Sequence, residues 1–212
     1  MSNTYVLDAE TVHYSWDNTI TPRLTIDAGD TVVFSTIDAG DGFYNQDSTS
    51  EDIEKAGPFN GHPLTGPVYI RDAAPGDVLA IKIVAMEIAS TFGWTVMKPG
   101  PGLLPANELP GAYLQIWDLS DGTHARMRQR KDIAVPVASF PGVMGNALAE
   151  AGSHSTIPPR ATGGNMDNKH LTVGSTLYLP IQVEGALFST GDAHAAQGDG
   201  ECCVTAIETC SR

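Results

Sequence analysis

Short runs of β-branched and aromatic residues, rather than long amphipathic helices, dominate the hydrophobic pattern of the chain. Residues 24–26 and 31–36 flank the turn sequence Ala-Gly-Asp, and residues 68–70 and 78–86 flank Asp-Ala-Ala-Pro-Gly-Asp. In each turn, glycine can take the position with positive φ and aspartate can bond the turn backbone. The pattern predicts two strand–turn–strand units that use the same device.

Further strand-like runs lie along the rest of the chain, at residues 113–117, 133–137, 175–183, 186–189 and 201–208. Pro136 favours the edge or the end of a strand, because proline cannot donate to a strand ladder. Residues 139–152 are mostly small and predict one or two helical turns. We therefore expect a mainly β fold, a β-sandwich or jelly-roll-like arrangement of many short strands and long loops, with little helix.

Composition is that of a globular chain. Hydrophobic residues make up 42% and charged residues 17% of the 212 residues, so a core forms readily. We expect a single domain over residues 1–212, and a division into two β subdomains near 1–90 and 91–212 is left open. The sequence has no βα alternation, no Gly-x-Gly-x-x-Gly and no Walker motif, which excludes a Rossmann-type nucleotide site.

Charge narrows the range of partners. The net charge of −13 repels phosphate backbones and anionic lipid, so we expect neither nucleic acid nor a membrane surface as a partner.

The start shows no signal-peptide pattern, and no apolar run approaches the length of a membrane span. Cys202, Cys203 and Cys210 are odd in number and close together, which argues against a disulfide scaffold. We expect a protein of the cytoplasm.

The most informative stretch is Gly-Asp-Ala-His-Ala-Ala-Gln-Gly-Asp-Gly-Glu, residues 191–201. Asp192 and His194 are two apart, so an extended backbone would point both to one side. A carboxylate and an imidazole suit a divalent metal such as zinc. Glu201 can be a ligand, a general base or a nucleophile. A polar loop whose acids are merely solvated is the alternative.

Two other loops carry candidate residues. In Pro-Pro-Arg-Ala-Thr-Gly-Gly-Asn-Met-Asp-Asn, Asn165 and Asp167 are again two apart and follow a flexible pair that ends in Gly164. An ordinary turn is the alternative reading. His62 precedes a proline, which holds it extended and lets its ring be aimed. Asp38 lies just past a strand end, a frequent place for functional carboxylates.

Two rival catalytic interpretations are weaker. A Ser-His-Asp triad lacks the Gly-x-Ser-x-Gly turn that positions its nucleophile. A cysteine nucleophile at Cys202 or Cys203 would lie on the strand predicted after Glu201, where buried thiols are usually inert.

The chain resembles the acetamidase/formamidase family. The resemblance rests on Gly-Asp-x-His-x-x-Gln-Gly-Asp-Gly-Glu, Pro-Pro-Arg-x-x-Gly-Gly-Asn-Met-Asp, the block around His62 and the early His13-x-x-Trp16, whose order and spacing match along nearly the whole chain. It implies a β-rich fold, a homo-oligomer (a dimer or higher) and hydrolysis of short aliphatic amides at a divalent metal, zinc or else calcium.

The resemblance also suggests roles for the candidate residues. We expect Asp192, His194, His62 and Asp38 to bind the metal, Glu201 to act as general base and Asn165 to bind the oxyanion. We assign Asp167, Gln197 and Gly164 to substrate binding. Because known members of the family are longer, a non-catalytic β protein that binds a metal or a small ligand is the open alternative.

Overall fold

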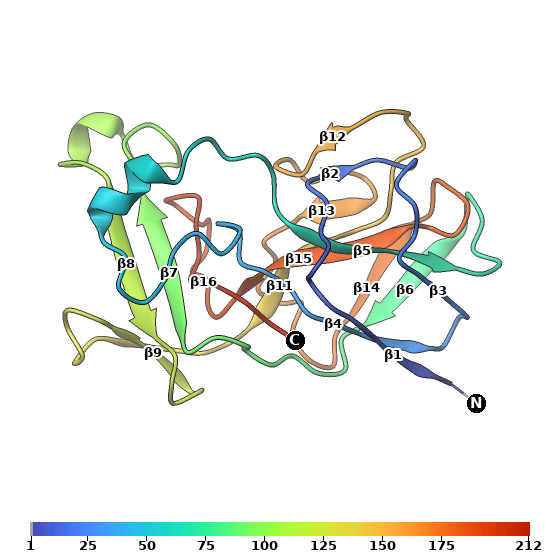
Figure 1. Cartoon of the computed structure of the whole chain (residues 1–212), viewed down its shortest axis with the longest axis horizontal. Helices are drawn as coiled ribbons and strands as arrows, with labels where there is room; N and C mark the ends of the chain where they lie inside the picture. Colours follow the sequence, from blue (N-terminus) through green and yellow to red (C-terminus); the bar gives the residue numbers. More distant parts are fainter. Residues whose placement is uncertain (1) are drawn as a thin grey trace.

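The computed structural model describes residues 2–212 and is mainly β (Figure 1). Its helical content is limited to two 3₁₀ segments, η1 (Ser50–Lys55) and η2 (Ala106–Glu108), within that range. The prediction of a strand-rich fold with little helix is confirmed.

The strands are short, and most are joined by long loops. They are β1 (Thr4–Leu7), β2 (Ser15–Trp16), β3 (Leu24–Ile26), β4 (Thr31–Phe34), β5 (Leu64–Ile70), β6 (Val78–Lys82), β7 (Phe92–Met97), β8 (Tyr113–Asp118), β9 (His124–Met127), β10 (Ala134–Pro136), β11 (Phe140–Gly145), β12 (His154–Ser155), β13 (Gly163–Asn165), β14 (Thr176–Pro180), β15 (Phe188–His194) and β16 (Glu208–Thr209).

Ten strands form one mixed sheet with β15 near its middle. The order is β10-β9-β8-β7-β16-β15-β11-β13, and β5 joins β15 and β3 off this path. Every residue of β15 is buried, so neither face of this strand meets solvent. Three two-stranded sheets, β1-β4, β2-β12 and β6-β14, surround the large one. The most enclosed strand of the fold is therefore the one that carries Asp192 and His194.

The two predicted turn devices are present before β4 and β6. Gly29 and Gly76 have φ of 93° and 98°. Asp30 accepts hydrogen bonds from the backbone of Asn3 and Asp27, and the Asp77 carboxylate accepts one from Ala74 N. Each aspartate thereby closes its turn just before a strand begins.

Two local predictions are wrong. Residues 140–145 form β11 instead of helical turns. Their small residues serve close packing: a Cβ on Gly145 would lie 2.8 Å from the ring of Trp16. The strand expected at 201–208 exists only as β16, because Glu201 and Val204 have positive φ and close a turn. Pro136 ends β10, which is the sheet edge, as expected.

Apolar side chains gather in four clusters, and two of them flank the centre of the sheet. One surrounds Val68, Met144 and Phe188. The other contains Ile53 of η1 together with Leu114 of β8 and side chains of β7. No helix among residues 2–212 is long and apolar enough to cross a membrane. The three cysteines are free.

Leu114 offers a test of the core around η1. Its side chain is 1% exposed, so Leu114→Ala should lower the free energy of unfolding by about 2–5 kcal/mol, because it removes buried methyl groups and leaves a cavity. Val173 is 55% exposed, so Val173→Ala is the control and should change that value by less than about 0.5 kcal/mol. Urea unfolding measures both; equal effects would contradict the assigned packing.

Candidate metal and active site

Asp192 and His194 lie together at the end of β15. His194 Nε2 is 3.3 Å from Asp192 Oδ1, and both side chains are almost fully buried. Asp192 has a φ of 53°, which is unusual for a non-glycine residue inside a strand. Such outliers concentrate at functional sites, where the surrounding structure maintains them.

Glu208 completes this group, and the sequence reasoning missed it. The β15–β16 register places Glu208 directly opposite His194, and Glu208 Oε2 lies 3.2 Å from His194 Nε2. Its other oxygen accepts a hydrogen bond from Ala206 N. One feature of the sequence could have indicated it: Glu208 is a single acidic residue in the mostly apolar run Val-Thr-Ala-Ile-Glu-Thr, and a buried charge requires a partner.

The donor set of Asp192, His194 and Glu208 fits a small divalent cation. Asp192 Oδ1 and Glu208 Oε2 are buried and accept no hydrogen bond. All three ligand atoms lie within 4.8 Å of one another. Ligands about 2.0–2.1 Å from a tetrahedral ion stand about 3.3 Å apart, which is close to the two nitrogen–oxygen distances given above. Carboxylate and imidazole donors suit zinc among the common metals.

Gln197 orients the His194 ring. Its Nε2 donates to the Asp167 carbonyl oxygen at 2.9 Å, so its Oε1 faces His194 Nδ1 at 3.0 Å. Nδ1 must then carry a proton, and a neutral His194 has its lone pair on Nε2, toward Asp192 and Glu208. Such an outer partner typically fixes the tautomer of a metal-binding histidine.

Asp167 and Glu201 form a second, half-buried pair beside His194. One ligand atom from each of the three lies within 4.8 Å of the others. Burial together with the charge of the neighbouring acids raises the pKa of Asp167 to about 6 and that of Glu201 to about 7. Both residues have positive φ, 44° and 42°.

The electrostatics of the buried group favour a cation. Burial, opposed by His194, raises the pKa of Glu208 to about 8. Burial also acts against ionisation of Asp192 and His194, yet the pKa of Asp192 is held low by His194, and that of His194 is raised by Glu208 and Asp192. The carboxylates of Asp192 and Glu208 thus have only one positive charge near them, that of the protonated His194 ring. A divalent ion would stabilise all the carboxylates in their ionised forms.

His62 lies near the group of Asp192, His194 and Glu208, on the side of Asp192 Oδ2. Its side chain is 10% exposed, and Nε2 lies 3.7 Å from Asp192 Oδ2. Thr156 Oγ1 accepts a hydrogen bond from the His62 backbone N and lies 3.0 Å from Nδ1. The ring of Phe59 packs edge-on against the imidazole with centroids 4.9 Å apart. The structure thus brings His62 to the site, although it belongs to neither group of three.

Asn165 and Gly164 lie on β13. Asn165 Nδ2 donates to the Ile157 carbonyl oxygen, while its Oδ1 is buried without a hydrogen-bond partner. Gly164 pairs with Met144 and has a φ of 104°. In the sheet β11 lies between β13 and β15, so one strand separates both residues from Asp192 and His194.

Asp38 is not brought into either group. Its Oδ1 accepts hydrogen bonds from Gly40 N and Trp94 Nε1, and its Oδ2 faces Cys210 Sγ at 3.8 Å. These contacts give the carboxylate partners within the protein, so the expected role of Asp38 as a metal ligand stays a prediction that the two groups of three do not support. Burial raises the pKa of Asp38 despite these hydrogen bonds.

Gly142 on β11 packs directly against Asp192 and His194. Its carbonyl oxygen accepts hydrogen bonds from the backbone N of both Met166 and Asp167. A Cβ at this position would lie 2.8 Å from Asp192 O, 2.8 Å from His194 Cε1 and 2.9 Å from Asp192 Oδ2. Only glycine lets β11 approach Asp192 and His194 this closely.

Comparison with known proteins identifies the family. The sequence profile of the Acetamidase/Formamidase family matches residues 2–152 and 146–212. The chain belongs to this family. It is 28% identical to the acetamidase of Mycolicibacterium smegmatis over 247 residues, covering 89% of this chain and 61% of that protein.

Solved structures of the family share the fold. The acetamidase of Bacillus halodurans superimposes with a TM-score of 0.86 at 29% identity, covering 97% of this chain and 67% of that one. The gamma lactamase of Delftia acidovorans gives 0.88 at 25% identity, covering 99% and 66%. This chain spans about three fifths of the length of its named relatives, 59% to 61%.

A single methyl group at Gly142 tests the close packing behind the ligands. Gly142→Ala should lower the free energy of unfolding by about 1–3 kcal/mol, because the added Cβ meets backbone and ligand atoms that are held in place. The matched control is Gly198→Ala in the same motif, where a Cβ meets nothing within 4 Å. Chemical denaturation measures both, and a Gly142→Ala protein as stable as the control would show that the ligands can move aside.

Proposed function

We propose that the protein hydrolyses short aliphatic amides, of the formamide or acetamide type, to a carboxylate and ammonia with the help of a divalent metal, zinc in the first instance. The observation that carries this proposal is the buried group of Asp192, His194 and Glu208, whose free oxygens surround His194 Nε2. Membership of the Acetamidase/Formamidase family supports this substrate class.

In this proposal Asp192, His194 and Glu208 hold the metal, and Gln197 holds the imidazole in its metal-binding tautomer. His62 steadies the second oxygen of Asp192. When bound, the metal would polarise the amide carbonyl and acidify a water. The protein must then move a proton from that water to the departing nitrogen.

Glu201 is placed for that transfer. It is half-buried beside His194 and Asp167 and lies outside the group of three that we assign to the metal. Its pKa of about 7 lets it both accept and return a proton near neutral pH. Asn165 has one amide hydrogen beyond the bond to Ile157 O, and we propose that it faces the developing oxyanion.

The alternative function is a non-catalytic protein that binds a metal or a small ligand, for which the buried group of Asp192, His194 and Glu208 would suffice. Such a protein would keep the site without turnover. Ammonia release from formamide and acetamide, measured before and after chelation, separates the two: release that chelation abolishes supports the hydrolase, and metal binding without release supports the binding protein.

Glu201→Gln and Glu208→Gln form a matched pair of substitutions with distinct expected outcomes. Glu201→Gln should retain bound metal but lower turnover by about 10²–10⁴-fold, because the proton acceptor is gone. Glu208→Gln removes a ligand charge and should weaken metal binding by at least about tenfold, with activity lost in parallel. Metal content by elemental analysis and kcat for acetamide are the readouts.

The results for these two variants assign separate roles to the Glu201 and Glu208 carboxylates. Normal turnover in Glu201→Gln would remove the residue from the chemistry. Loss of metal in Glu201→Gln with full retention in Glu208→Gln would place the ion instead among Asp167, His194 and Glu201. Native gel filtration of the wild-type chain tests the proposed homo-oligomer separately.

A further inference from the structure

The side chain of Thr156 contacts His62 at two points. Thr156 Oγ1 accepts a hydrogen bond of 2.8 Å from the His62 backbone N–H and lies 3.0 Å from His62 Nδ1. Among residues 2–212, these two atoms of His62 are the only hydrogen-bond partners of this hydroxyl. Thr156 is 0% exposed, so bulk water does not compete for it. The direction of the hydroxyl hydrogen is therefore decided by His62.

This contact determines which ring nitrogen of His62 carries the proton. A hydroxyl has one hydrogen to donate and lone pairs that accept. Because Thr156 Oγ1 accepts from the backbone N–H, its hydrogen is available to Nδ1, which must then be an unprotonated acceptor. A neutral imidazole with a lone pair on Nδ1 has its hydrogen on Nε2. A proton on Nδ1 would instead leave the Thr156 hydrogen buried without an acceptor, which is costly.

The Nε2–H group of His62 faces the candidate site. Nε2 lies 3.7 Å from Asp192 Oδ2, which is too far for a hydrogen bond. Within residues 2–212, this nitrogen has no hydrogen-bond partner at a normal distance. The ring is nevertheless held on two sides, by Thr156 at Nδ1 and by the edge-on ring of Phe59. The site therefore contains a fixed hydrogen-bond donor that is free to bind an oxygen atom.

The two histidines of the site thus have opposite tautomers. Gln197 Oε1 requires a proton on His194 Nδ1, so a neutral His194 presents a lone pair through Nε2. The Thr156 hydroxyl requires a lone pair on His62 Nδ1, so His62 presents a hydrogen through Nε2. A lone pair binds a metal ion, whereas an N–H group binds an oxygen. The partner of Nδ1 therefore distinguishes a metal-binding histidine from a donor.

We infer that His62 is a catalytic hydrogen-bond donor whose Nε2–H binds the carbonyl oxygen of the amide substrate, and that Thr156 is the positioning residue that fixes its tautomer. The inference rests on the proposed amide hydrolysis, and it gives His62 a role other than the metal-binding one expected from the sequence. Negative charge develops on the carbonyl oxygen as water attacks the carbon, so a fixed donor binds the transition state more strongly than the substrate. His62 keeps its proton throughout, and the proton for the leaving nitrogen still passes through Glu201.

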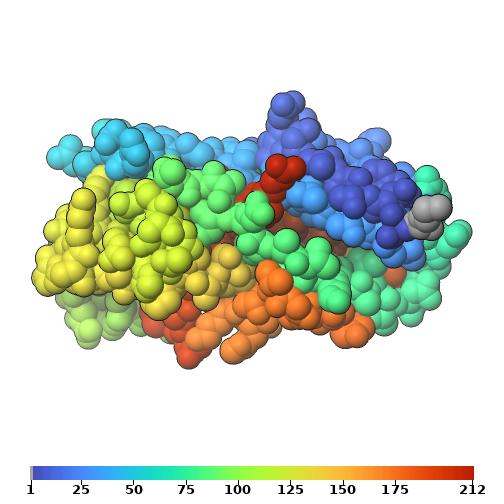
Figure 2. Space-filling model, turned by 90° about the horizontal axis from the view of Figure 1, so that it is seen from below, coloured from blue at the N-terminus to red at the C-terminus, as the bar shows by residue number. Residues whose placement is uncertain are grey.

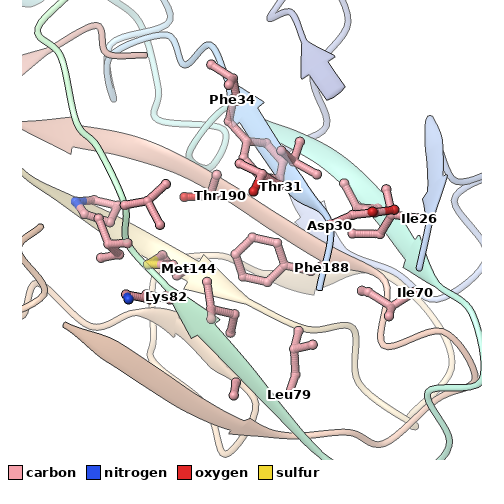
Figure 3. A pocket seen from close by; sticks show the side chains of 18 of the residues that line it. Ile26, Asp30, Thr31, Phe34, Ile70, Leu79, Lys82, Met144, Phe188 and Thr190 are labelled. Atoms are coloured by element: carbon pink, nitrogen blue, oxygen red, sulfur yellow. The ribbon is translucent and has the colours of Figure 1, made fainter. Parts of the chain in front are cut away.

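A long apolar groove elsewhere in the molecule is a second place where a small amide could bind. It has a volume of about 1280 Å³, and Figure 2 shows it as the hollow between the blue N-terminal segments and the green segment that contains β6. Figure 3 shows Phe34 and Leu79 on opposite walls, with Phe188 between them. Neither His62 nor Thr156 lines the groove. Binding in the groove and binding at His62 can therefore be distinguished by the residues that respond.

Nitrogen-15 chemical shifts of the histidine rings in the zinc-loaded protein test the tautomer independently of turnover. For His62 we expect the shift of a protonated Nε2 and that of an unprotonated Nδ1 which accepts a hydrogen bond. Thr156→Val should move the Nδ1 shift to that of a free lone pair, and Thr156→Ser should restore it. A protonated Nδ1 in the wild-type protein, or an Nδ1 shift that Thr156→Val leaves unchanged, would overturn the inference. This tautomer in a protein that releases no ammonia would contradict the proposed function instead.

Kinetics test the role of the donor. His62→Ala should lower kcat for acetamide by about 10²–10³-fold and retain bound zinc. His62→Gln should recover part of this loss, because its side-chain amide can donate from a similar position. Loss of zinc in His62→Ala would make His62 a metal ligand, and equal kcat values in the two variants would make it a structural residue. Either result would overturn the inference.

Thr123→Val is the matched control for the threonine substitution. Thr123 Oγ1 lies 3.0 Å from His124 Nδ1, the same distance as in the Thr156–His62 pair, but at an exposed position. Thr123→Val should leave kcat for acetamide unchanged, whereas Thr156→Val should lower it. Equal kcat values in the two valine variants would remove Thr156 from its positioning role and overturn the inference.

Acetamide added to the zinc-loaded Glu201→Gln protein locates the bound amide. This variant should turn over slowly, so the amide persists during the measurement. We expect acetamide to move the Nε2 shift of His62 and to leave the backbone amide signals of β4 and β6 in place. Movement of the β4 and β6 signals with none at His62 would place the amide in the groove and would overturn the inference.

Discussion

The burial of several acids around one imidazole is the constraint on which the rest of the structure depends. His194 Nε2 faces Asp192 on its own strand and Glu208 on the neighbouring strand, at 3.3 and 3.2 Å. Taking these charges out of water is expensive unless a partner balances them. The imidazole alone balances one of them, so the cluster has the electrostatic character of a cation site.

The fold supplies this cluster by enclosing β15 completely. Strands β5, β11 and β16 bond to its edges, and Gly142 on β11 lets the backbone come within contact of both ligands. The residue that orients His194 comes from the loop after β15, and the second acidic pair comes from the segments around residues 167 and 201. The segment that presents Glu208 continues into Ser211, which forms bridges to Thr36 and Ile88 and so holds β16 in place.

The turns, most strands and the proximity of Asp192 and His194 could be predicted from the sequence, because those features are local. The glycine and aspartate before β4 and β6 act through bonds within a few residues, and the spacing of Asp192 and His194 reflects the period of a strand. Glu208 could not be found this way, because it meets His194 through a pairing between strands that spacing does not encode. Asp38 lies away from this group for a related reason: its place near a strand end does not determine which side chains surround it. The small residues of 139–152 predict helical turns, but in β11 they permit close packing between a strand and its neighbours.

The central claim is that one divalent ion is bound by Asp192, His194 and Glu208. Anomalous diffraction at the zinc absorption edge, from crystals of the chain grown with zinc, tests it most directly. The account predicts one strong peak within about 2.3 Å of His194 Nε2 and of an oxygen from each of the two carboxylates. The absence of a peak there, or a peak bounded by Asp167 and Glu201 alone, would contradict it.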